Sequence, residues 1–255
     1  MFEAELAFAN ELADEAGRIA MSFFRGTFVV REKPDRSPVT EADIAVERAI
    51  REALRERFPA DAVLGEEAGL EGASDRRWIV DPIDGTRNFA DGVQVWATLI
   101  ALAVDEVPVV GVVGAPALGE RYAAARGAGA RLNGDPIRVS GADRVPDAFV
   151  LYAEAPELLG GTYREPFIRL ISEARRERGF GDFWGHMLVA RGSADAMLEP
   201  ALATWDWAAL QVVVEEAGGR VSTFEGEPLA HGSSVLSTNG ALHDELVRRL
   251  RGNRD

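Results

Sequence analysis

The sequence contains no cysteine and only three histidines, so the side chains that usually hold zinc are scarce. Without cysteine, disulfide bonds and thiolate metal sites are excluded. The histidines, His186, His231 and His243, do not have the spacing of a zinc site. Any metal site must therefore be built from oxygen atoms, which favours the hard cations Mg²⁺, Mn²⁺ and Ca²⁺.

The chain also lacks long apolar stretches and is poor in positive charge. No run of about 18 apolar residues occurs, so no transmembrane helix is predicted. The first residues, MFEAELAFANELADEAGRIA, contain acids where a signal peptide has basic residues, and we expect a cytoplasmic protein. The net charge of −14 would repel the phosphate backbone of a nucleic acid. We therefore expect neither a membrane nor a nucleic acid as a partner.

The order of the expected elements indicates an α/β fold. Apolar residues at spacings of three and four predict a helix over residues 3–24, and Thr40 with Asp43 forms a capping-box pattern that opens a second helix. Two long antiparallel strands are expected over residues 95–113, where β-branched residues are frequent. Further expected strands cover residues 28–30, 62–64, 78–80, 121–125, 149–152, 196–199, 219–222 and 234–237, and further helices cover residues 165–178, 184–191, 205–217 and 241–251.

This pattern changes near residues 141–147. Long strands dominate before that segment, whereas short strands alternate with helices after it. We therefore predict two α/β subdomains, residues 1–144 and residues 145–255. A loop that contains two prolines is expected over residues 33–38.

The most informative segment is WIVDPIDGTRNF. A hydrophobic strand here ends in two aspartates, Asp81 and Asp84, and Pro82 restricts the backbone where both carboxylates converge. Gly85 permits close approach of the backbone to a ligand, and the N–H groups of Gly85 and Thr86 could hold phosphate oxygens. The alternative for this motif alone is an Asx turn in which Asp84 caps a helix.

Three further acidic positions strengthen the case for an oxygen-lined site. Glu66 follows a short expected strand, and its alternative role is a solvated acidic turn. Asp206 lies between two tryptophans at the start of an expected helix, where the alternative role is that of the N-cap residue. Asp43 belongs to the first turn of the second helix, where acids are common because they complement the helix dipole.

In this order, the segments GEE, WIVDPIDGTRNF and WDWAALQVVVEEAGG resemble the three signature motifs of the inositol monophosphatase superfamily. The resemblance extends from the first helix to the last. It implies an αβαβα sandwich of two subdomains, a homodimer, and Mg²⁺-dependent hydrolysis of a small-molecule phosphate monoester. Two or three Mg²⁺ ions per site are implied, with Mn²⁺ able to substitute.

The same resemblance implies roles for individual residues. Asp81 would bridge two metal ions, Asp43 and Thr86 would orient the attacking water, and Glu66 would serve in catalysis as well as in metal binding. Lys33 falls near a lysine often found in the loop before the water-orienting aspartate, and a solvated loop lysine is the alternative. The implied metal ligands are four carboxylates and one backbone carbonyl, those of Glu66, Asp81, Ile83, Asp84 and Asp206.

The second half of the chain carries the substrate signal. Its segment GFGDFWGHMLVARGSADAMLEP resembles the histidinol-phosphate phosphatase branch, which implies L-histidinol phosphate as the substrate. Inositol 1-phosphate or a range of sugar phosphates is the alternative, and a non-catalytic metal- or phosphate-binding protein is a remote one. Asp182 puts a negative charge where the inositol enzymes have a small neutral residue, and Glu199 stands where the family uses an acid to contact the body of the substrate. Both are therefore expected to bind the substrate. The alternatives are a helix cap for Asp182, and core or dimer contacts for Trp184 and His186.

Overall fold

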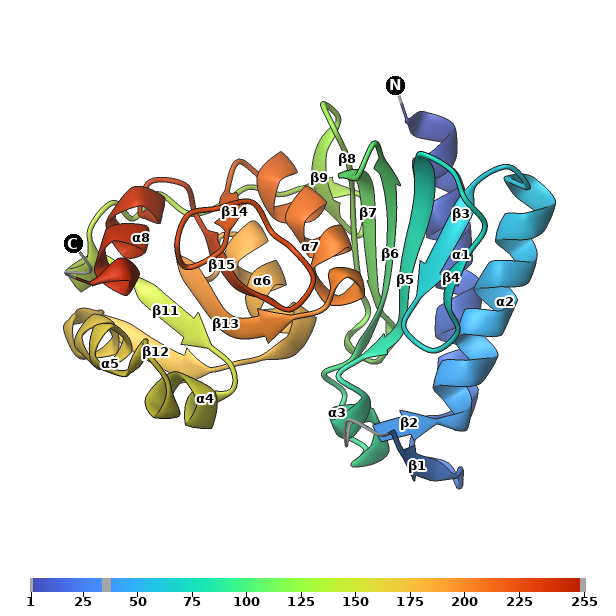
Figure 1. Cartoon of the computed structure of the whole chain (residues 1–255), viewed down its shortest axis with the longest axis horizontal. Coiled ribbons are helices and arrows are strands. Elements are labelled where there is room, and N and C mark those ends of the chain that lie inside the picture. The colour runs from blue at the N-terminus through green and yellow to red at the C-terminus, as the bar shows by residue number, and fades with distance from the viewer. Residues whose placement is uncertain (1, 34–37, 253–255) are drawn as a thin grey trace.

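The structure is a computed structural model that describes residues 2–33 and 38–252. Its elements form five layers in the order α, β, α, β, α, which follow one another across Figure 1. This arrangement confirms the predicted αβαβα sandwich. Within the described residues, no helix is both long enough and apolar enough to cross a membrane.

Helices make up three of the five layers. Two further short helices, α3 (Thr86–Ala90) and α4 (Ala155–Gly160), both border the cavity described below, and α4 packs against α5. The layer helices are α1 (Glu3–Phe23) and α2 (Glu41–Arg57) on one side, α6 (Asp182–Ala190) and α7 (Thr204–Glu216) in the middle, and α5 (Arg164–Glu173) and α8 (His243–Arg251) on the other side.

The larger sheet has eight strands in the order β10-β9-β8-β7-β6-β5-β3-β4. Most neighbours are antiparallel, but β3 runs parallel to β5. The carboxyl ends of β3 and β5 therefore meet at the same edge of the sheet. The strands are β3 (Ala62–Gly65), β4 (Gly69–Glu71), β5 (Arg76–Asp84), β6 (Ala97–Val104), β7 (Val107–Ala115), β8 (Glu120–Ala125), β9 (Gly129–Leu132) and β10 (Asp135–Pro136).

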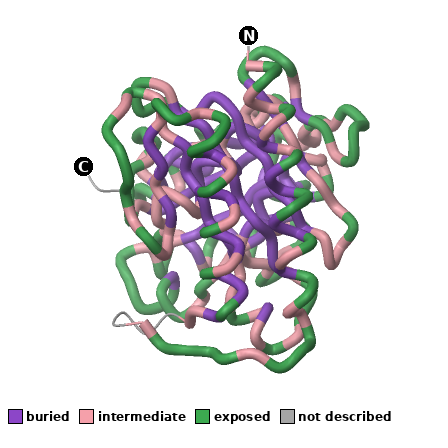
Figure 2. Tube along the Cα trace, turned by 90° about the vertical axis from the view of Figure 1, so that its right-hand side faces the viewer, coloured by how far each residue is buried: buried purple, intermediate pink, exposed green. Residues whose placement is uncertain are grey.

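Strand β6 is buried on both faces. Leu99 packs in the cluster that contains α6 and α7, whereas Ile100 packs in the cluster that contains α1 and α2. This alternation with a period of two is that of a strand between two helical layers. Strands β6 and β7 confirm the two long antiparallel strands predicted for this region. Figure 2 shows the buried segments in the centre of the molecule and the exposed segments around them.

The smaller sheet has five strands in the order β12-β11-β13-β15-β14. Strand β11 runs parallel to both of its neighbours, and the other pairs are antiparallel. A separate hairpin pairs β1 with β2. These strands are β1 (Val30–Glu32), β2 (Pro38–Thr40), β11 (Phe149–Tyr152), β12 (Arg176–Gly179), β13 (Ala196–Leu202), β14 (Arg220–Ser222) and β15 (Ser233–Thr238).

Some predicted elements differ from the structure. The helix expected over residues 165–178 ends at Glu173, and the next residues form β12 at the edge of the smaller sheet. The RERG sequence of β12 favours a helix on local propensity, and pairing with β11 overrides that preference. The strand expected at residues 28–30 begins later, as β1. Most of the loop expected over residues 33–38 lies outside the described residues.

The two sheets come from different parts of the chain. All strands of the larger sheet lie within residues 62–136, and all strands of the smaller sheet lie within residues 149–238. Helix α7 nevertheless packs on β6 and β7 of the larger sheet. The division into residues 1–144 and 145–255 stays a prediction, because the two parts share this core.

Candidate active site

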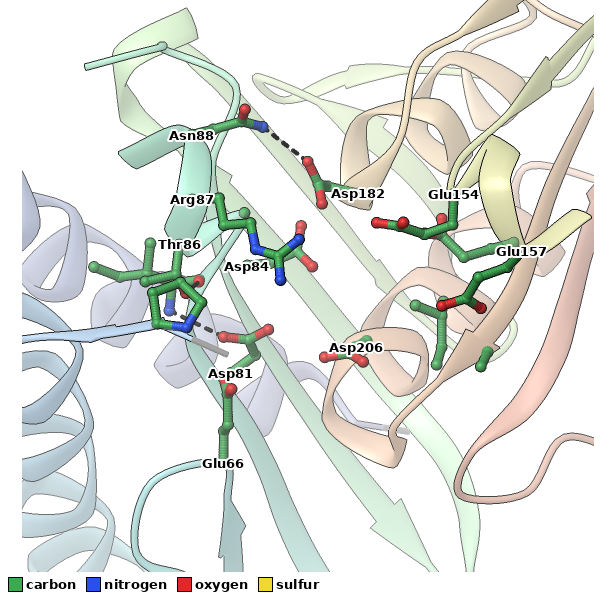
Figure 3. A pocket seen from close by; sticks show the side chains of 16 residues that line it. Glu66, Asp81, Asp84, Thr86, Arg87, Asn88, Glu154, Glu157, Asp182 and Asp206 are labelled. Atoms are coloured by element: carbon green, nitrogen blue, oxygen red, sulfur yellow. Dashed lines mark hydrogen bonds between the residues drawn. The ribbon is translucent and has the colours of Figure 1, made fainter. Parts of the chain in front are cut away.

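A cavity of about 480 Å³ opens where the two sheets face each other across α6 and α7. The end of β5 and the start of α3 form one wall, and α4, α6, β13 and the start of α7 form the other (Figure 3). The cavity is rich in carboxylates on both walls. The acidic residues that line it are Glu66, Asp81, Asp84, Glu154, Glu157, Asp182, Glu199 and Asp206.

Strand β5 brings two aspartates to the same side of the sheet. In a regular strand, residues three apart point to opposite faces. The pairing with β6 is irregular here, because Asp81 lies opposite Leu99 and Asp84 lies opposite Ala97, which leaves one extra residue in β5. This bulge allows both carboxylates to line the cavity, although both residues are more than nine-tenths buried.

Asp206 joins this pair from the first turn of α7. Its carboxylate accepts a hydrogen bond from the Ala203 N–H at 2.7 Å, which fixes the side chain at the start of the helix. Ala203 is the N-cap residue, so the alternative in which Asp206 is the N-cap is wrong. One oxygen from each of Asp81, Asp84 and Asp206 lies within 4.8 Å of the other two.

Burial and mutual repulsion raise the pKa values of these three carboxyl groups. Burial is the largest cause in each, and the charges of Glu66 and Asp182 add to it for Asp81 and Asp84 respectively. The pKa of Asp206 is raised to about 7. Charged carboxylates at this spacing need a neighbouring positive charge. A hard divalent cation held by oxygen atoms therefore fits this group.

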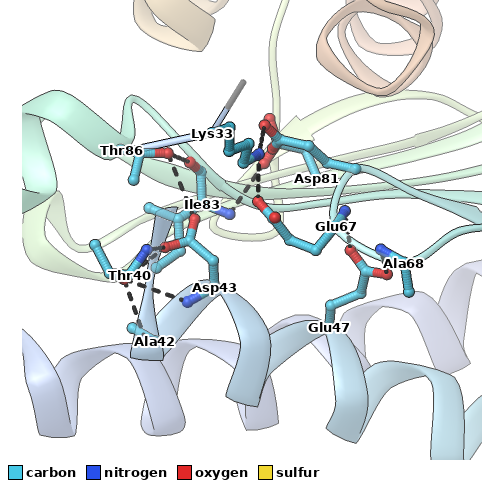
Figure 4. A network of polar contacts seen from close by, with 11 residues as sticks. Lys33, Thr40, Ala42, Asp43, Glu47, Glu67, Ala68, Asp81, Ile83 and Thr86 are labelled. Carbon is cyan, nitrogen blue, oxygen red and sulfur yellow. Dashed lines mark hydrogen bonds and ion pairs between the residues drawn. The ribbon is translucent and has the colours of Figure 1, made fainter. Parts of the chain in front are cut away.

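Glu66 lines the same cavity from the turn after β3, and Lys33 contacts it. Lys33 Nζ lies 2.8 Å from Glu66 Oε1 and 2.7 Å from Glu67 Oε1 (Figure 4 shows the lysine). Burial disfavours the charge of Lys33, but the hydrogen bonds to both glutamates raise its pKa. Lys33 is therefore held by acids of the site, and the alternative of a solvated loop lysine is wrong.

The Thr86 hydroxyl lies close to two oxygens of the site. It is 2.9 Å from the carbonyl oxygen of Ile83 and 3.4 Å from Asp43 Oδ1 (Figure 4). Asp43 is held at the start of α2, where its Oδ2 accepts a hydrogen bond from the Thr40 N–H at 2.8 Å. The predicted capping box is therefore confirmed. Burial raises the pKa of Asp43 to about 6.

The turn between β5 and α3 requires a glycine. Gly85 has a φ of +79°, and a Cβ atom there would lie 2.9 Å from the carbonyl oxygen of Val95. Gly85 is the N-cap residue of α3, so the alternative in which Asp84 caps this helix is wrong. Asp84 Oδ2 instead accepts a hydrogen bond from the Phe183 N–H, at 2.8 Å, at the start of α6.

Asp182 stands on the opposite wall of the cavity. Its Oδ2 accepts a hydrogen bond from Asn88 Nδ2 at 2.8 Å (Figure 3). The N-cap residue of α6 is Gly181 and Asp182 is the first helical residue, so its alternative role as a helix cap is wrong. Burial raises the pKa of Asp182 to about 6, and the charge of Glu154 adds to this effect.

Glu199 and His186 lie deeper on the same side. Glu199 is only 5% exposed, and burial raises its pKa well above the usual range, with the charge of Asp182 adding to the shift. His186 is fully buried, and its Nδ1 lies 2.7 Å from Ser237 Oγ. This burial confirms the interpretation of His186 as a core residue, and Trp184 packs at the border of the same core.

Sequence reasoning missed four polar residues that line the cavity, which are Arg87, Asn88, Glu154 and Glu157. The first two belong to the WIVDPIDGTRNF segment, so their place next to Thr86 was a usable signal. The two glutamates lie at the start of α4, a helix that was not predicted. Helix α4 packs against α5, and only this tertiary packing brings the two glutamates to the cavity, because no local pattern marks them.

Known proteins resemble this chain over its whole length. The inositol monophosphatase family matches residues 2–254. A histidinol-phosphatase of Mycobacterium tuberculosis is 45% identical and covers 98% of this chain and 99% of the relative. A histidinol-phosphatase of Streptomyces coelicolor is 42% identical and covers 96% of each. The solved inositol monophosphatase from Anabaena superposes with a TM-score of 0.87 at 31% identity, and covers 98% of this chain and 96% of that one. The chain therefore belongs to the inositol monophosphatase family and is a hydrolase of phosphate monoesters.

Proposed function

We propose that the enzyme hydrolyses L-histidinol phosphate to L-histidinol and inorganic phosphate. The observation that supports this most is the second group of acids, Asp182 and Glu199, which line the cavity together with the group of Asp81, Asp84 and Asp206. Histidinol carries an ammonium group and an imidazole beside its phosphate ester. Inositol offers only neutral hydroxyls, which gain less from carboxylates.

We propose Mg²⁺ as the metal, in two or three ions per site, with Mn²⁺ able to substitute. When bound, Mg²⁺ neutralises phosphate charge and lowers the pKa of water. Oxygen ligands at the end of β5 suit this cation. The Ile83 carbonyl accepts one hydrogen bond from Thr86 and keeps a second lone pair for a ligand. The proposed ligands are Glu66, Asp81, the carbonyl of Ile83, Asp84 and Asp206.

Asp43 and Thr86 are the residues proposed to orient the attacking water. The Thr86 hydroxyl lies within 3.4 Å of the Asp43 carboxylate, so a proton of the water can pass to this pair, with Glu66 close by as a further acceptor. The backbone N–H groups of Gly85 and Thr86, at the start of α3, are proposed to hold phosphate oxygens.

A test of the metal site uses Asp84→Asn. The amide oxygen of asparagine can still accept the hydrogen bond from the Phe183 N–H, so the fold should persist. Loss of the ligand charge should lower kcat by at least about 100-fold and weaken activation by Mg²⁺. EDTA should abolish turnover of the wild-type enzyme, and added Mg²⁺ should restore it. Full activity without a divalent metal would refute the proposal.

A test of the substrate compares kcat/KM for histidinol phosphate, inositol 1-phosphate and fructose 1,6-bisphosphate. A charge-assisted hydrogen bond to the ammonium contributes about 1.5–3 kcal/mol, which corresponds to a preference of roughly 10–150-fold. Asp182→Ala should reduce this preference, because it removes one of the proposed partners of the ammonium. A wild-type preference for inositol 1-phosphate would favour the alternative substrate, which the likeness to the Anabaena enzyme supports.

We also propose that the enzyme is a cytoplasmic homodimer that binds neither nucleic acid nor membrane. The acidic balance of the chain, net −14, supports the absence of nucleic-acid binding. Light scattering of the purified protein tests the dimer, and the mass of a single chain would contradict it.

A further inference from the structure

Glu199 and His186 form a polar pair that faces inward from the cavity. His186 Nε2 lies 3.6 Å from Glu199 Oε2. Both atoms are shielded from solvent, and neither has a hydrogen-bond partner in the part of the chain that the structure describes. Buried polar atoms are rarely left unpaired. A small shift of either side chain would therefore bring the two atoms within hydrogen-bond distance of each other.

Ser237 contacts the other nitrogen of the same ring. Its Oγ lies 2.7 Å from His186 Nδ1, and the serine is almost completely buried. If the hydroxyl donates to Nδ1, the single ring hydrogen of a neutral imidazole stands on Nε2, where it faces Glu199. Burial lowers the pKa of His186 to about 3, which keeps the ring neutral.

These residues come from three elements that pack together. Glu199 lies on β13 opposite Val235 of β15, and Ser237 lies farther along β15. His186 projects from α6, which packs on both strands. Of the three polar residues, Glu199 lines the cavity, and the other two stand behind it. His186 and Ser237 are therefore placed to support the carboxylate of Glu199.

We propose that His186 is a positioning residue, which holds the carboxylate of Glu199 toward the cationic part of the substrate, while Ser237 sets the tautomer of its ring. This inference rests on the proposed function, in which Glu199 contacts the substrate ammonium. Without a donor at Nε2, the carboxylate loses its fixed direction. The affinity for a phosphate ester with a cationic group should then fall, whereas the rate of hydrolysis of an ester without a cation should stay the same.

The experiment compares His186→Leu, which removes the donor at similar volume, with His186→Gln, which keeps an N–H near the position of Nε2. Steady-state kinetics are measured with Mg²⁺ on histidinol phosphate and on p-nitrophenyl phosphate, which carries no cation. His186→Leu should lower kcat/KM for histidinol phosphate roughly tenfold, mainly through KM, and change that for p-nitrophenyl phosphate by less than about twofold. His186→Gln should retain the histidinol phosphate value within about threefold.

A matched pair of serine variants keeps the test valid if His186→Leu does not fold. Ser222 is the control, because it lies on strand β14 and contacts the other buried histidine, His243. Ser222 Oγ lies 3.0 Å from His243 Nε2. Ser237→Ala should lower the preference for histidinol phosphate about threefold, and Ser222→Ala should leave it unchanged. Equal losses on both esters, or an unchanged preference in both His186→Leu and Ser237→Ala, would overturn the positioning role.

The ring tautomer gives a readout that does not depend on the substrate. A long-range ¹H–¹⁵N correlation spectrum of the Mg²⁺-loaded enzyme should show His186 with its hydrogen on Nε2, and a hydrogen on Nδ1 would overturn the inference. A wild-type enzyme with no preference for histidinol phosphate would overturn the proposed function. A preference that is present in the wild type and intact in the variants would overturn only the role of His186.

Discussion

The Thr86 side chain connects the backbone of β5 to the start of α2. Its hydroxyl reaches both the Ile83 carbonyl and the Asp43 carboxylate, which come from different elements. A hydroxyl with an acceptor on either side is well placed to orient a water molecule. The role of the hydroxyl can be separated from that of packing by two substitutions, because serine at this position keeps the hydroxyl and alanine removes it.

Thr86→Ala should lower kcat roughly 100-fold, because positioning and proton transfer by such a group contribute on that order. Thr86→Ser should retain kcat within about tenfold, since the hydroxyl remains but the side chain is freer. Steady-state kinetics at saturating Mg²⁺ measure both variants, with thermal unfolding as the control for folding. Equal kcat values for the two variants would argue against a role of the hydroxyl.

At the scale of elements, helix α2 holds the turn that carries Glu66. The buried carboxylate of Glu47 accepts hydrogen bonds from the Glu67 N–H at 2.8 Å and the Ala68 N–H at 3.0 Å (Figure 4). It also pairs with Arg51 Nε at 2.8 Å. The turn after β3 is therefore fixed by a side chain of the neighbouring layer rather than by its own sequence.

Glu47→Ala should lower the free energy of unfolding by about 3 kcal/mol, because it removes the acceptor of two amides and of the buried Nε of Arg51. The same change should weaken Mg²⁺ activation, since the turn that carries Glu66 loses its anchor. Urea unfolding and a Mg²⁺ titration measure these effects. The control is Asp14→Ala, which removes an exposed partner of Arg121 and should change stability little. Similar losses in both variants would contradict the anchoring role.

At the scale of the whole molecule, the acidic cavity couples stability to pH and to metal. Burial raises the pKa of Asp43 to about 6 and that of Asp206 to about 7, and it raises those of Asp81 and Asp84 as well. An aspartate in the unfolded chain has a pKa of about 3.9. Between roughly pH 4 and pH 7, the folded metal-free protein therefore binds more protons than the unfolded chain, and its stability falls as the pH rises.

Thermal unfolding of the metal-free enzyme should show a lower Tm at about pH 8 than at about pH 5. Mg²⁺ should raise the Tm more at the higher pH, because the carboxylates are then ionised and bind the cation more tightly. In the metal-free Asp206→Asn variant, the Tm should fall less between these pH values, since one of the titrating groups is gone. A Tm that rises steadily from about pH 5 to about pH 8 without metal would contradict the sign of these pKa shifts.

The sequence by itself determined the features that depend on neighbouring residues. The Thr40 and Asp43 capping pair sets the start of α2, and the apolar and β-branched residues over 95–113 favour the strands β6 and β7, because each feature depends on interactions within a few residues. The segment WIVDPIDGTRNF placed Asp81 and Asp84 at the end of a strand for the same reason.

Only the tertiary structure decided what lies across the cavity. Asp182 meets Asn88, and the Phe183 N–H meets Asp84, between residues that are 94 and 99 positions apart in the chain. No local pattern encodes such contacts, because they depend on the packing of α6 between two sheets. Strand β12 belongs to the same class, since its sequence favours a helix and only the exposed edge of β11 gives it backbone partners.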